Sequence, residues 1–252
     1  MTVPSRAYDN KFFNSISGGS SRSAQRLLPL VMAALAPRSV IDVGCGRGVW
    51  LAEFMRLGVG DAIGVDGDYV TAETLAMPVG RFVPRDITQP FDLGRQFDLA
   101  LCLEVGEHVP NEASSELVSN IARHAAMVVF SAAVPGQGGQ DHINEMPLEF
   151  WRGLFEARGF EAFDPFRRAL RGFREVEPWY RNNVLLYVRS ELTDRLPAQV
   201  RATAIAKGTP IADLSSPLFQ LRKAVLRRLP RPVVNAMARA KHTIRGGLRA
   251  AN

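Results

Sequence analysis

Short apolar runs alternate along the chain with longer segments in which apolar residues recur every three or four positions. The runs are rich in Val, Ile and Leu, as expected of strands buried on both faces of a sheet, and they cover residues 39–44, 61–65, 81–83, 97–103, 127–131, 160–163 and 184–188. Helical spacing covers residues 24–35, 48–57, 111–124 and 147–158. Strands that alternate with helices in this way predict an α/β fold, with a parallel sheet covered by helices on both faces.

The pattern divides the chain into three parts. They are a helical lead-in over residues 1–38, a domain over 39–190, and a basic linker with an amphipathic helical tail over 191–252. The lead-in carries aromatic residues at Tyr8, Phe12 and Phe13. These side chains either pack against the domain or close a ligand site as a lid.

Basic charge is concentrated in the C-terminal part. The chain carries a net charge of +6, yet residues 191–252 hold 12 Lys and Arg against 3 Asp and Glu, whereas residues 1–190 hold 19 against 22. Residues 191–217 show no period and are typical of a linker, while 218–249 predicts two amphipathic helices divided by a Pro-Arg-Pro sequence. Because the main domain is mildly acidic, its charge does not favour nucleic acid as a partner.

The tail allows three interpretations: a segment that lies on an anionic membrane surface, a partner-binding helix, or a flexible basic appendage. Its apolar positions favour the first two. No apolar run approaches the roughly 20 residues that span a bilayer, the N-terminus does not resemble a signal peptide, and the two cysteines suggest no disulfide framework. We therefore expect a cytoplasmic location, with residues 218–249 as a candidate for docking on a protein or on the inner face of the membrane.

A glycine-rich turn follows the first predicted strand. Gly44, Gly46 and Gly48 stand at alternate positions between a strand that contains Asp42 and a helix whose apolar face begins at Val49. Glycine tolerates positive φ and leaves bare backbone against which a ligand can lie, and the N–H groups at a helix start are open to polar ligands. A dinucleotide-binding turn has a third glycine where this chain has Val49, so the pattern disfavours NAD.

The turn resembles motif I of the class I S-adenosylmethionine-dependent methyltransferases, whose glycine loop holds the methionine part of the cofactor. The resemblance covers about Tyr8 to Arg189. It implies S-adenosylmethionine as the cofactor and a Rossmann-like, doubly wound, mostly parallel seven-stranded sheet with an antiparallel last strand. The sequences YDNKFF, LEVGEHVP and PGQGGQDHINE are similar to those of bacterial methyltransferases associated with glycan or secondary-metabolite biosynthesis.

The resemblance also implies cofactor contacts where strands end. Asp66 ends the second strand, where the family places an acid on the ribose hydroxyls. Asp86 and Ile87 follow the third strand, where the family contacts adenine, and Glu104 ends the fourth, where the substrate site begins. Since the carboxyl ends of parallel strands share one edge of the sheet, these residues are expected around one ligand. The expected cofactor-binding residues are Asp42, Gly44, Cys45, Gly46, Gly48, Asp66, Gly67, Asp86, Ile87 and Glu104.

Two histidines are candidates for a general base. Methyl transfer to an oxygen benefits from a base, and histidine titrates near neutral pH. His142 lies in the polar, glycine-rich segment 135–147, and His108 follows the fourth strand; each has the alternative role of ordering its own loop. The expected substrate-binding residues are Glu107, Asp141, Glu145 and Tyr180, although core packing is the simpler explanation for Tyr180.

The chemistry leaves three functional hypotheses. The leading one is a methyltransferase that acts on an oxygen, less readily a nitrogen, of a small molecule or glycan. The alternatives are an NAD-dependent oxidoreductase, which Val49 disfavours, and a non-catalytic Rossmann-like docking module. Asp141, His142 and Glu145 are residue types that ligate divalent metals, but no further well-spaced ligands accompany them, so the sequence predicts no metal site.

Overall fold

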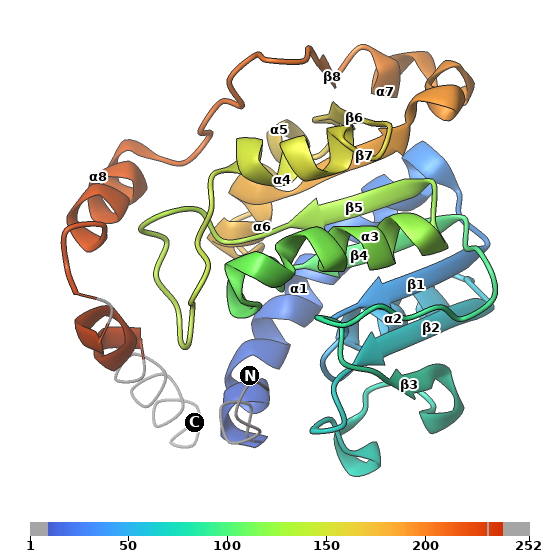
Figure 1. Ribbon diagram of the computed structural model, residues 1–252, viewed down its shortest axis with the longest axis horizontal. Coiled ribbons are helices and arrows are strands. Elements are labelled where there is room, and N and C mark those ends of the chain that lie inside the picture. Colours follow the sequence, from blue (N-terminus) through green and yellow to red (C-terminus); the bar gives the residue numbers. More distant parts are fainter. Residues whose placement is uncertain (1–9, 231, 239–252) are drawn as a thin grey trace.

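An eight-stranded sheet lies between two layers of helices in the computed structural model, which describes residues 10–230 and 232–238 (Figure 1). The strand order is β3-β2-β1-β4-β5-β7-β6-β8. The strands are β1 (Ser39–Val43), β2 (Asp61–Asp66), β3 (Phe82–Pro84), β4 (Leu99–Leu103), β5 (Met127–Ser131), β6 (Phe160–Phe163), β7 (Leu185–Arg189) and β8 (Ala204–Ile205).

The directions of the strands confirm the predicted Rossmann-like sheet. Strands β1 to β5 are parallel, with Ile41 of β1 paired to Ile63 of β2 and to Ala100 of β4. Strand β7 lies between β5 and β6 and is antiparallel to both. The sheet has one strand more than the predicted seven, because β8 pairs antiparallel with β6. It contains only two residues, too few for the sequence to show a strand period.

Helices cover both faces, and each layer has its own apolar core. The helices are α1 (Asn10–Leu35), α2 (Val49–Arg56), α3 (Ser114–His124), α4 (Leu148–Glu156), α5 (Arg167–Leu170), α6 (Pro178–Asn183), α7 (Ala198–Arg201) and α8 (Pro217–Leu226), with 3-10 turns at Ala72–Thr74, Val79–Arg81, Gly106–His108, Asn111–Ala113 and Ser190–Arg195. On one face, α1, α2, α5 and α6 pack against the sheet through residues such as Leu28 and Phe54. On the other face, α3 and α4 pack through residues such as Ile121 and Phe155.

The N-terminal helix is longer than its apolar spacing predicts. It begins at Asn10, whereas the pattern predicts a start at residue 24, and it continues through Pro29. Tyr8 lies outside the described residues, and so do the side chains of Phe12 and Phe13. The expectation of an aromatic lid therefore falls on residues that the structure does not describe.

The stretch after β7 packs against the sheet, where the sequence predicts a linker over 191–217. Leu196, Val200 and Ile211 are buried, and β8 extends the sheet. The apolar residues of this stretch follow short turns, so they carry no sustained period. Beyond it, α8 and a helical stretch over 232–238 are separated at the Pro-Arg-Pro sequence, as predicted. None of the helices described here has the length and apolar content needed to cross a membrane.

Candidate active site

The candidate site begins at the carboxyl edge of β1, β2 and β4. The backbone N–H groups of Gly44 and Cys45 donate to the carbonyl of Val65 at 2.8 and 3.2 Å. The next N–H in the turn, that of Gly46, donates to Asp66 Oδ2 at 2.7 Å. The end of β2 therefore holds the turn that follows β1.

Positive φ angles fix the shape of that turn. Gly44, Gly46 and Gly48 have φ of 81°, 51° and 75°, which glycine adopts without steric cost. A Cβ on Gly44 would lie 2.5 Å from the side chain of Val105. The alternating glycines thus let the turn lie directly against the residue that follows β4, and they leave a bare backbone surface.

Asp66 is the anchor of the turn. It is 4% exposed, and its carboxylate accepts from the N–H groups of Gly46 and Gly67 at 2.7 Å each and from the hydroxyl of Tyr69. Burial raises the pKa of Asp66, and these three hydrogen bonds partly offset that rise. A carboxylate has about four acceptor positions, so one remains for a ligand hydroxyl while Tyr69 stays bound.

Asp42, near the end of β1, is a second buried acid at this edge of the sheet. It is 2% exposed, and its Oδ2 has no hydrogen-bond partner among the described residues. Burial, and secondarily the charge of Asp66, raises the pKa of Asp42 to about 8. A buried carboxyl with one unpartnered oxygen favours a cationic ligand, because only an opposite charge or a donor compensates for its lost hydration.

These residues fit S-adenosylmethionine. The unpartnered oxygen of Asp42 suits the ammonium of the methionine part, and the bare backbone of the glycine turn leaves room for that part. Asp66 retains acceptor capacity for a ribose hydroxyl. The expected adenine contacts, Asp86 and Ile87, follow β3 as predicted. Asp86 is exposed and accepts from Thr88 N at 2.9 Å, while Asn120 of α3 donates to the Ile87 carbonyl at 3.2 Å.

The two cysteines are buried thiols. Burial, followed by the charges of Asp66 and Asp42, raises the pKa of Cys45 well above its ordinary value. Burial also raises the pKa of Cys102, with contributions from Asp42, Glu107 and Asp66. Both thiols are therefore protonated and poor nucleophiles. Since Asp42, Asp66 and Glu107 all raise the pKa of Cys102, acids from the cofactor side and from the segment after β4 act on the same strand.

The segment after β4 turns sharply at Glu104. This residue has φ of 56°, a left-handed conformation that is uncommon outside glycine. Its Oε2 accepts from Gln137 Nε2 at 2.8 Å, and Gln137 Oε1 accepts in turn from Asn183 Nδ2 at 2.7 Å. Gln137 and Asn183 are buried. This chain of hydrogen bonds connects β4 to the glycine-rich loop and to α6.

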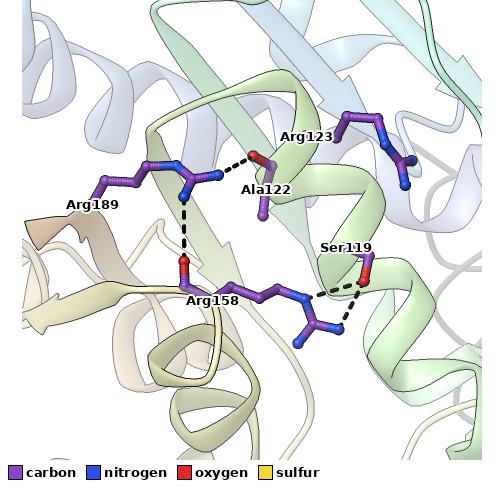
Figure 2. A pocket seen from close by; sticks show the side chains of 5 residues that line it. All are labelled: Ser119, Ala122, Arg123, Arg158 and Arg189. Atoms are coloured by element: carbon purple, nitrogen blue, oxygen red, sulfur yellow. Dashed lines mark hydrogen bonds between the residues drawn. The ribbon is translucent and has the colours of Figure 1, made fainter.

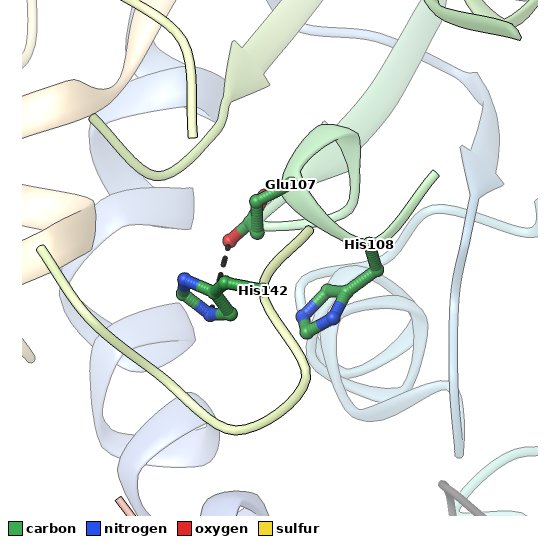
Figure 3. Close-up of side chains that lie close together, drawn as sticks. All are labelled: Glu107, His108 and His142. Carbon is green, nitrogen blue, oxygen red and sulfur yellow. Dashed lines mark ion pairs between the residues drawn. The ribbon is translucent and has the colours of Figure 1, made fainter. Parts of the chain in front are cut away.

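Glu107, His108 and His142 lie together beyond that turn (Figure 3). Glu107 is 1% exposed, and neither of its carboxyl oxygens has a hydrogen-bond partner among the described residues. Its Oε1 lies 3.9 Å from His142 Nε2, and the two imidazole rings meet edge to face at 4.9 Å. Burial and the charge of Glu104 raise the pKa of Glu107 well above its ordinary value. Burial, together with the charge of His142, lowers the pKa of His108 to about 3.

Glu145 orients His142 and shapes the glycine-rich loop. Its carboxylate accepts from His142 Nδ1 at 2.9 Å and from the N–H groups of Gly136 and Gly138 at 2.8 and 2.7 Å. Although burial acts in the opposite direction, these hydrogen bonds and the charge of His142 lower the pKa of Glu145. Because Nδ1 donates to a carboxylate, the Nε2 lone pair of the neutral ring is directed elsewhere.

The loop itself is fixed on the segment after β4. The N–H groups of Ile143 and Asn144 donate to the carbonyl of Glu107 at 2.9 and 3.0 Å. Asn144 is buried, and its amide donates to the carbonyl of Gly106 at 3.1 Å. Asp141 has φ of 57°, so the backbone beside His142 is also in the left-handed region. These contacts hold His142 against the end of β4, although the two segments are far apart in the sequence.

Tyr180, the remaining expected substrate residue, lies in the core. It is 5% exposed and packs edge to face on Trp50, with ring centroids 4.9 Å apart. Its hydroxyl lies 3.2 Å from Ser20 Oγ of α1. In this position Tyr180 connects α6 with the lead-in helix.

The structure adds residues that the sequence did not single out. Tyr69, Gln137, Asn144 and Asn183 each hold an expected site residue or its loop. Only Gln137 and Asn144 carry a local signal, because both stand in the polar loop after β5. Nothing in the sequence around Asn183 marks it, since its role depends on the position of α6.

A separate pocket of about 360 Å³ lies at the other end of the sheet, lined by Ser119, Ala122, Arg123, Arg158 and Arg189 (Figure 2). Arg189 is the last residue of β7 and donates to the carbonyls of Arg158 and Ala122 at 3.3 and 3.0 Å. Arg158 donates to Ser119 Oγ at 2.7 Å. These guanidinium groups join α3 to the end of α4, and the start of β5 beside them is opposite the carboxyl edge. The pocket therefore does not belong to the candidate site.

Comparison with known proteins shows that more than half of the chain matches one protein family. Residues 20–164 match the family model described as "Methyltransferase domain". The chain is 37% identical over 89 residues to the ubiquinone biosynthesis O-methyltransferase of Pseudomonas putida; this match covers 32% of the chain and 38% of the length of that curated relative.

Solved structures of methyltransferases share the fold. The sugar N-methyltransferase KedS8 from Streptoalloteichus sp ATCC 53650 superposes with a TM-score of 0.52 at 19% identity, over 67% of this chain and 87% of that one. Streptomyces venezuelae DesVI superposes with a TM-score of 0.55 at 17% identity, over 71% of this chain and 95% of that one. At these identities the likeness concerns the fold alone.

The anchoring role of Asp66 predicts its effect on cofactor binding. Asp66→Ala removes the acceptor of the Gly46 and Gly67 N–H groups and of a ribose hydroxyl, so we expect the affinity for S-adenosylhomocysteine to fall at least about tenfold. Titration calorimetry measures this without an acceptor substrate. Asp68→Ala, at an exposed position two residues away, is the matched control and leaves the affinity unchanged. Equal affinity in both variants would contradict the assignment.

The raised pKa of Asp42 predicts how stability depends on pH. Between an ordinary pKa of 3.8 and about 8, the folded protein keeps a proton that the unfolded chain has released. This group's contribution to the free energy of unfolding therefore falls as pH rises through that window, by at most about 1.4 kcal/mol per pH unit. Urea unfolding at about pH 5, 7 and 9 checks this. Asp42→Asn flattens the fall, and parallel profiles for the two proteins would show that the carboxyl is not perturbed.

Proposed function

Because the chain belongs to the methyltransferase-domain family of S-adenosylmethionine-dependent enzymes, we propose that it transfers a methyl group to an oxygen of a small molecule or glycan. Its membership confirms the resemblance drawn from the glycine turn. The family also disfavours the NAD-dependent oxidoreductase and the non-catalytic docking module as alternatives.

The position of His142 is the observation that supports methylation of an oxygen. Its Nδ1 is held by Glu145 at 2.9 Å, and its Nε2 is directed to the segment after β4, which the family uses for substrate. A hydroxyl is a weak nucleophile until its proton is removed, and an imidazole oriented by a carboxylate is suited to that task. A neutral amine needs less help, so nitrogen is the second choice of acceptor.

The mechanism assigns a task to each side of the carboxyl edge. S-adenosylmethionine, when bound, supplies an electrophilic methyl group. Asp42, Asp66 and the glycine turn hold the cofactor, and His142 Nε2 takes the proton from the acceptor hydroxyl. His108, a neutral imidazole against His142, keeps that ring in place. Holding both reactants in line supplies much of the rate enhancement, by proximity.

The acceptor site lies around the glycine-rich loop in this proposal. Glu107 and Asp141 border His142, and Glu145 acts on the acceptor through the orientation of His142. Tyr180 acts indirectly as well, by supporting α6 and Asn183. The curated relative is named as an O-methyltransferase, and one solved structure of the same fold is named as a sugar N-methyltransferase. Both names support a small-molecule acceptor.

The proposed base predicts a separation of turnover from cofactor binding. His142→Ala lowers methyl transfer at least about 100-fold, because it removes the imidazole that takes the acceptor proton. The affinity for S-adenosylhomocysteine changes less than about twofold. The assay follows labelled methyl transfer to a cell extract, with mass spectrometry for the mass increment of one methylene group. Ile143→Ala, at an exposed position of the same loop, is the control, and equal turnover in the two variants would exclude His142 as the base.

We also propose that α8 brings the enzyme to an anionic membrane surface. Leu218, Leu221 and Val225 follow one another at helical spacing and are 77%, 62% and 52% exposed. Arg227 and Arg228 follow them, both exposed. An exposed apolar stripe beside cationic residues suits a helix that lies in the headgroup region. The opposite side of α8 packs on the body, where Lys223 pairs with Asp213 at 2.5 Å.

Vesicle binding tests this role of α8. Leu221→Asp weakens binding to vesicles that contain anionic phospholipid by about tenfold or more, since it removes a leucine that inserts between the headgroups and adds a negative charge that the anionic lipid repels. Val79→Asp, at an exposed apolar position far from α8 in the sequence, leaves binding unchanged. Co-sedimentation with anionic and with neutral vesicles measures both. Binding to neither type by the unaltered protein would leave a protein partner as the target of α8.

A further inference from the structure

The Glu107 carboxyl is the least compensated acidic group at the edge of the sheet. It is 1% exposed, and both of its oxygens lack a hydrogen-bond partner among the described residues. Glu104, three residues earlier, also has a buried oxygen without such a partner. Two buried carboxyls on one short turn are costly to keep without a nearby positive charge. The described side chains beside them include a histidine, His142 next to Glu107, and an amide, Gln137 next to Glu104.

The nearest histidine has a nitrogen directed at this carboxyl. His142 Nε2 is 3.9 Å from Glu107 Oε1, and Glu145 holds Nδ1 from the other side. In many metal sites, one nitrogen of a histidine ligand donates a hydrogen bond to a carboxylate, and the other nitrogen coordinates the metal. His142 has this arrangement of neighbours. The same contact that suits a general base therefore suits a ligand.

His108 completes a group of three potential ligands (Figure 3). One nitrogen of each histidine and one oxygen of Glu107 all lie within 4.8 Å of one another. Two donors that are each about 2.1 Å from one ion are at most about 4.2 Å apart, and the pair of Glu107 and His142 is already closer than that. Small side-chain rotations bring the third donor within range.

We propose that Glu107, His108 and His142 bind one divalent transition-metal cation. Two imidazoles and a carboxylate suit Mn²⁺, Fe²⁺, Co²⁺ or Zn²⁺ better than Mg²⁺ or Ca²⁺, which prefer oxygen ligands alone. Glu104 lies beside the group as a further carboxylate, and Glu145 is the positioning residue that orients His142. Three protein ligands leave coordination positions open.

The cation refines the role of His142, and this part of the inference rests on the proposed function. With its Nε2 lone pair on the cation, His142 cannot also take the acceptor proton, so in the metal-bound protein His142 would be a ligand and the cation would activate the acceptor in its place. The open positions would take the acceptor hydroxyl, whose proton becomes more acidic on the cation and would pass to the unpartnered oxygen of Glu104 as the oxygen receives the methyl group. Turnover then depends on the metal, whereas cation binding itself requires no cofactor and no acceptor.

Titration of the metal-free protein with Co²⁺ tests the site directly. The full chain is treated with chelator and dialysed, and ligand-field absorption in the visible region reports binding. We expect one Co²⁺ per chain, with an affinity at least tenfold weaker in Glu107→Gln and in His142→Ala. Glu161→Gln changes an exposed carboxyl on β6 and binds Co²⁺ like the unaltered protein. Mg²⁺ competes poorly with Co²⁺, and Zn²⁺ competes well.

The outcomes separate this inference from the proposed function. Absence of Co²⁺ binding in the unaltered protein, or equal binding in Glu107→Gln with its fold intact by circular dichroism, overturns the metal site. If Glu107→Gln does not fold, equal binding in His142→Ala overturns it instead. Methyl transfer in the chelator-treated protein that equals transfer after Mn²⁺ is restored overturns the catalytic role. Co²⁺ bound at this site without any methyl transfer would contradict the proposed function and leave the site standing.

Discussion

Four carboxyl groups gathered at the carboxyl edge of the sheet impose the main electrostatic constraint on this molecule. Asp42, Asp66 and Glu107 are each less than 5% exposed, and Glu104 has a buried oxygen without a hydrogen-bond partner. Only Asp66 has its charge well compensated, by donors from the turn and from Tyr69. Burial of the others lowers stability, and such a cost persists where a ligand repays it. This edge of the sheet is therefore expected to bind positively charged ligands.

That constraint explains why the site has two halves. The cofactor carries a sulfonium and an ammonium group, which suit Asp42 on the β1 side. The proposed cation suits Glu107 on the β4 side, with Glu104 between them. Cys102 of β4 feels the charges of Asp42, Glu107 and Asp66 alike, so the halves share one low-dielectric strand. Because both ligands are positive, each occupied half is expected to repel the ligand of the other half, although less strongly than the nearby acids attract it.

The fold was largely predictable because its signals are local. Strands β1, β4 and β5 are uninterrupted apolar runs, and the glycine turn after β1 has a pattern that few other structures require. The predictions failed where packing overrides local pattern. Helix α1 extends back to Asn10 and through Pro29, beyond the apolar spacing of residues 24–35. Strand β8 depends on an existing edge at β6, and two residues carry no period.

The part of the site that could be predicted from the sequence consists of residues at the carboxyl ends of strands. Asp66 and Glu104 end strands in sequence and in space, so topology alone places them. The meeting of His142 with Glu107 depends on a loop whose path is set by backbone hydrogen bonds to the Glu107 carbonyl and by the left-handed conformation at Asp141. Sequence spacing instead grouped His142 with Asp141 and Glu145, and so it predicted no metal site.

Helix α8 ties the acceptor side to the tail. Arg222 and Arg227 donate to the carbonyls of Gln137 and Pro135 at 2.7 Å each, and a Cβ on Gly136 would collide with the backbone at Lys223. The loop that carries His142 is therefore held between α8 on one side and Glu107 on the other. A surface that binds α8 bears on this loop without touching the cofactor half, because the glycine turn is anchored through β2. If α8 docks as proposed, its movement is therefore expected to affect the proposed acceptor side before the cofactor side.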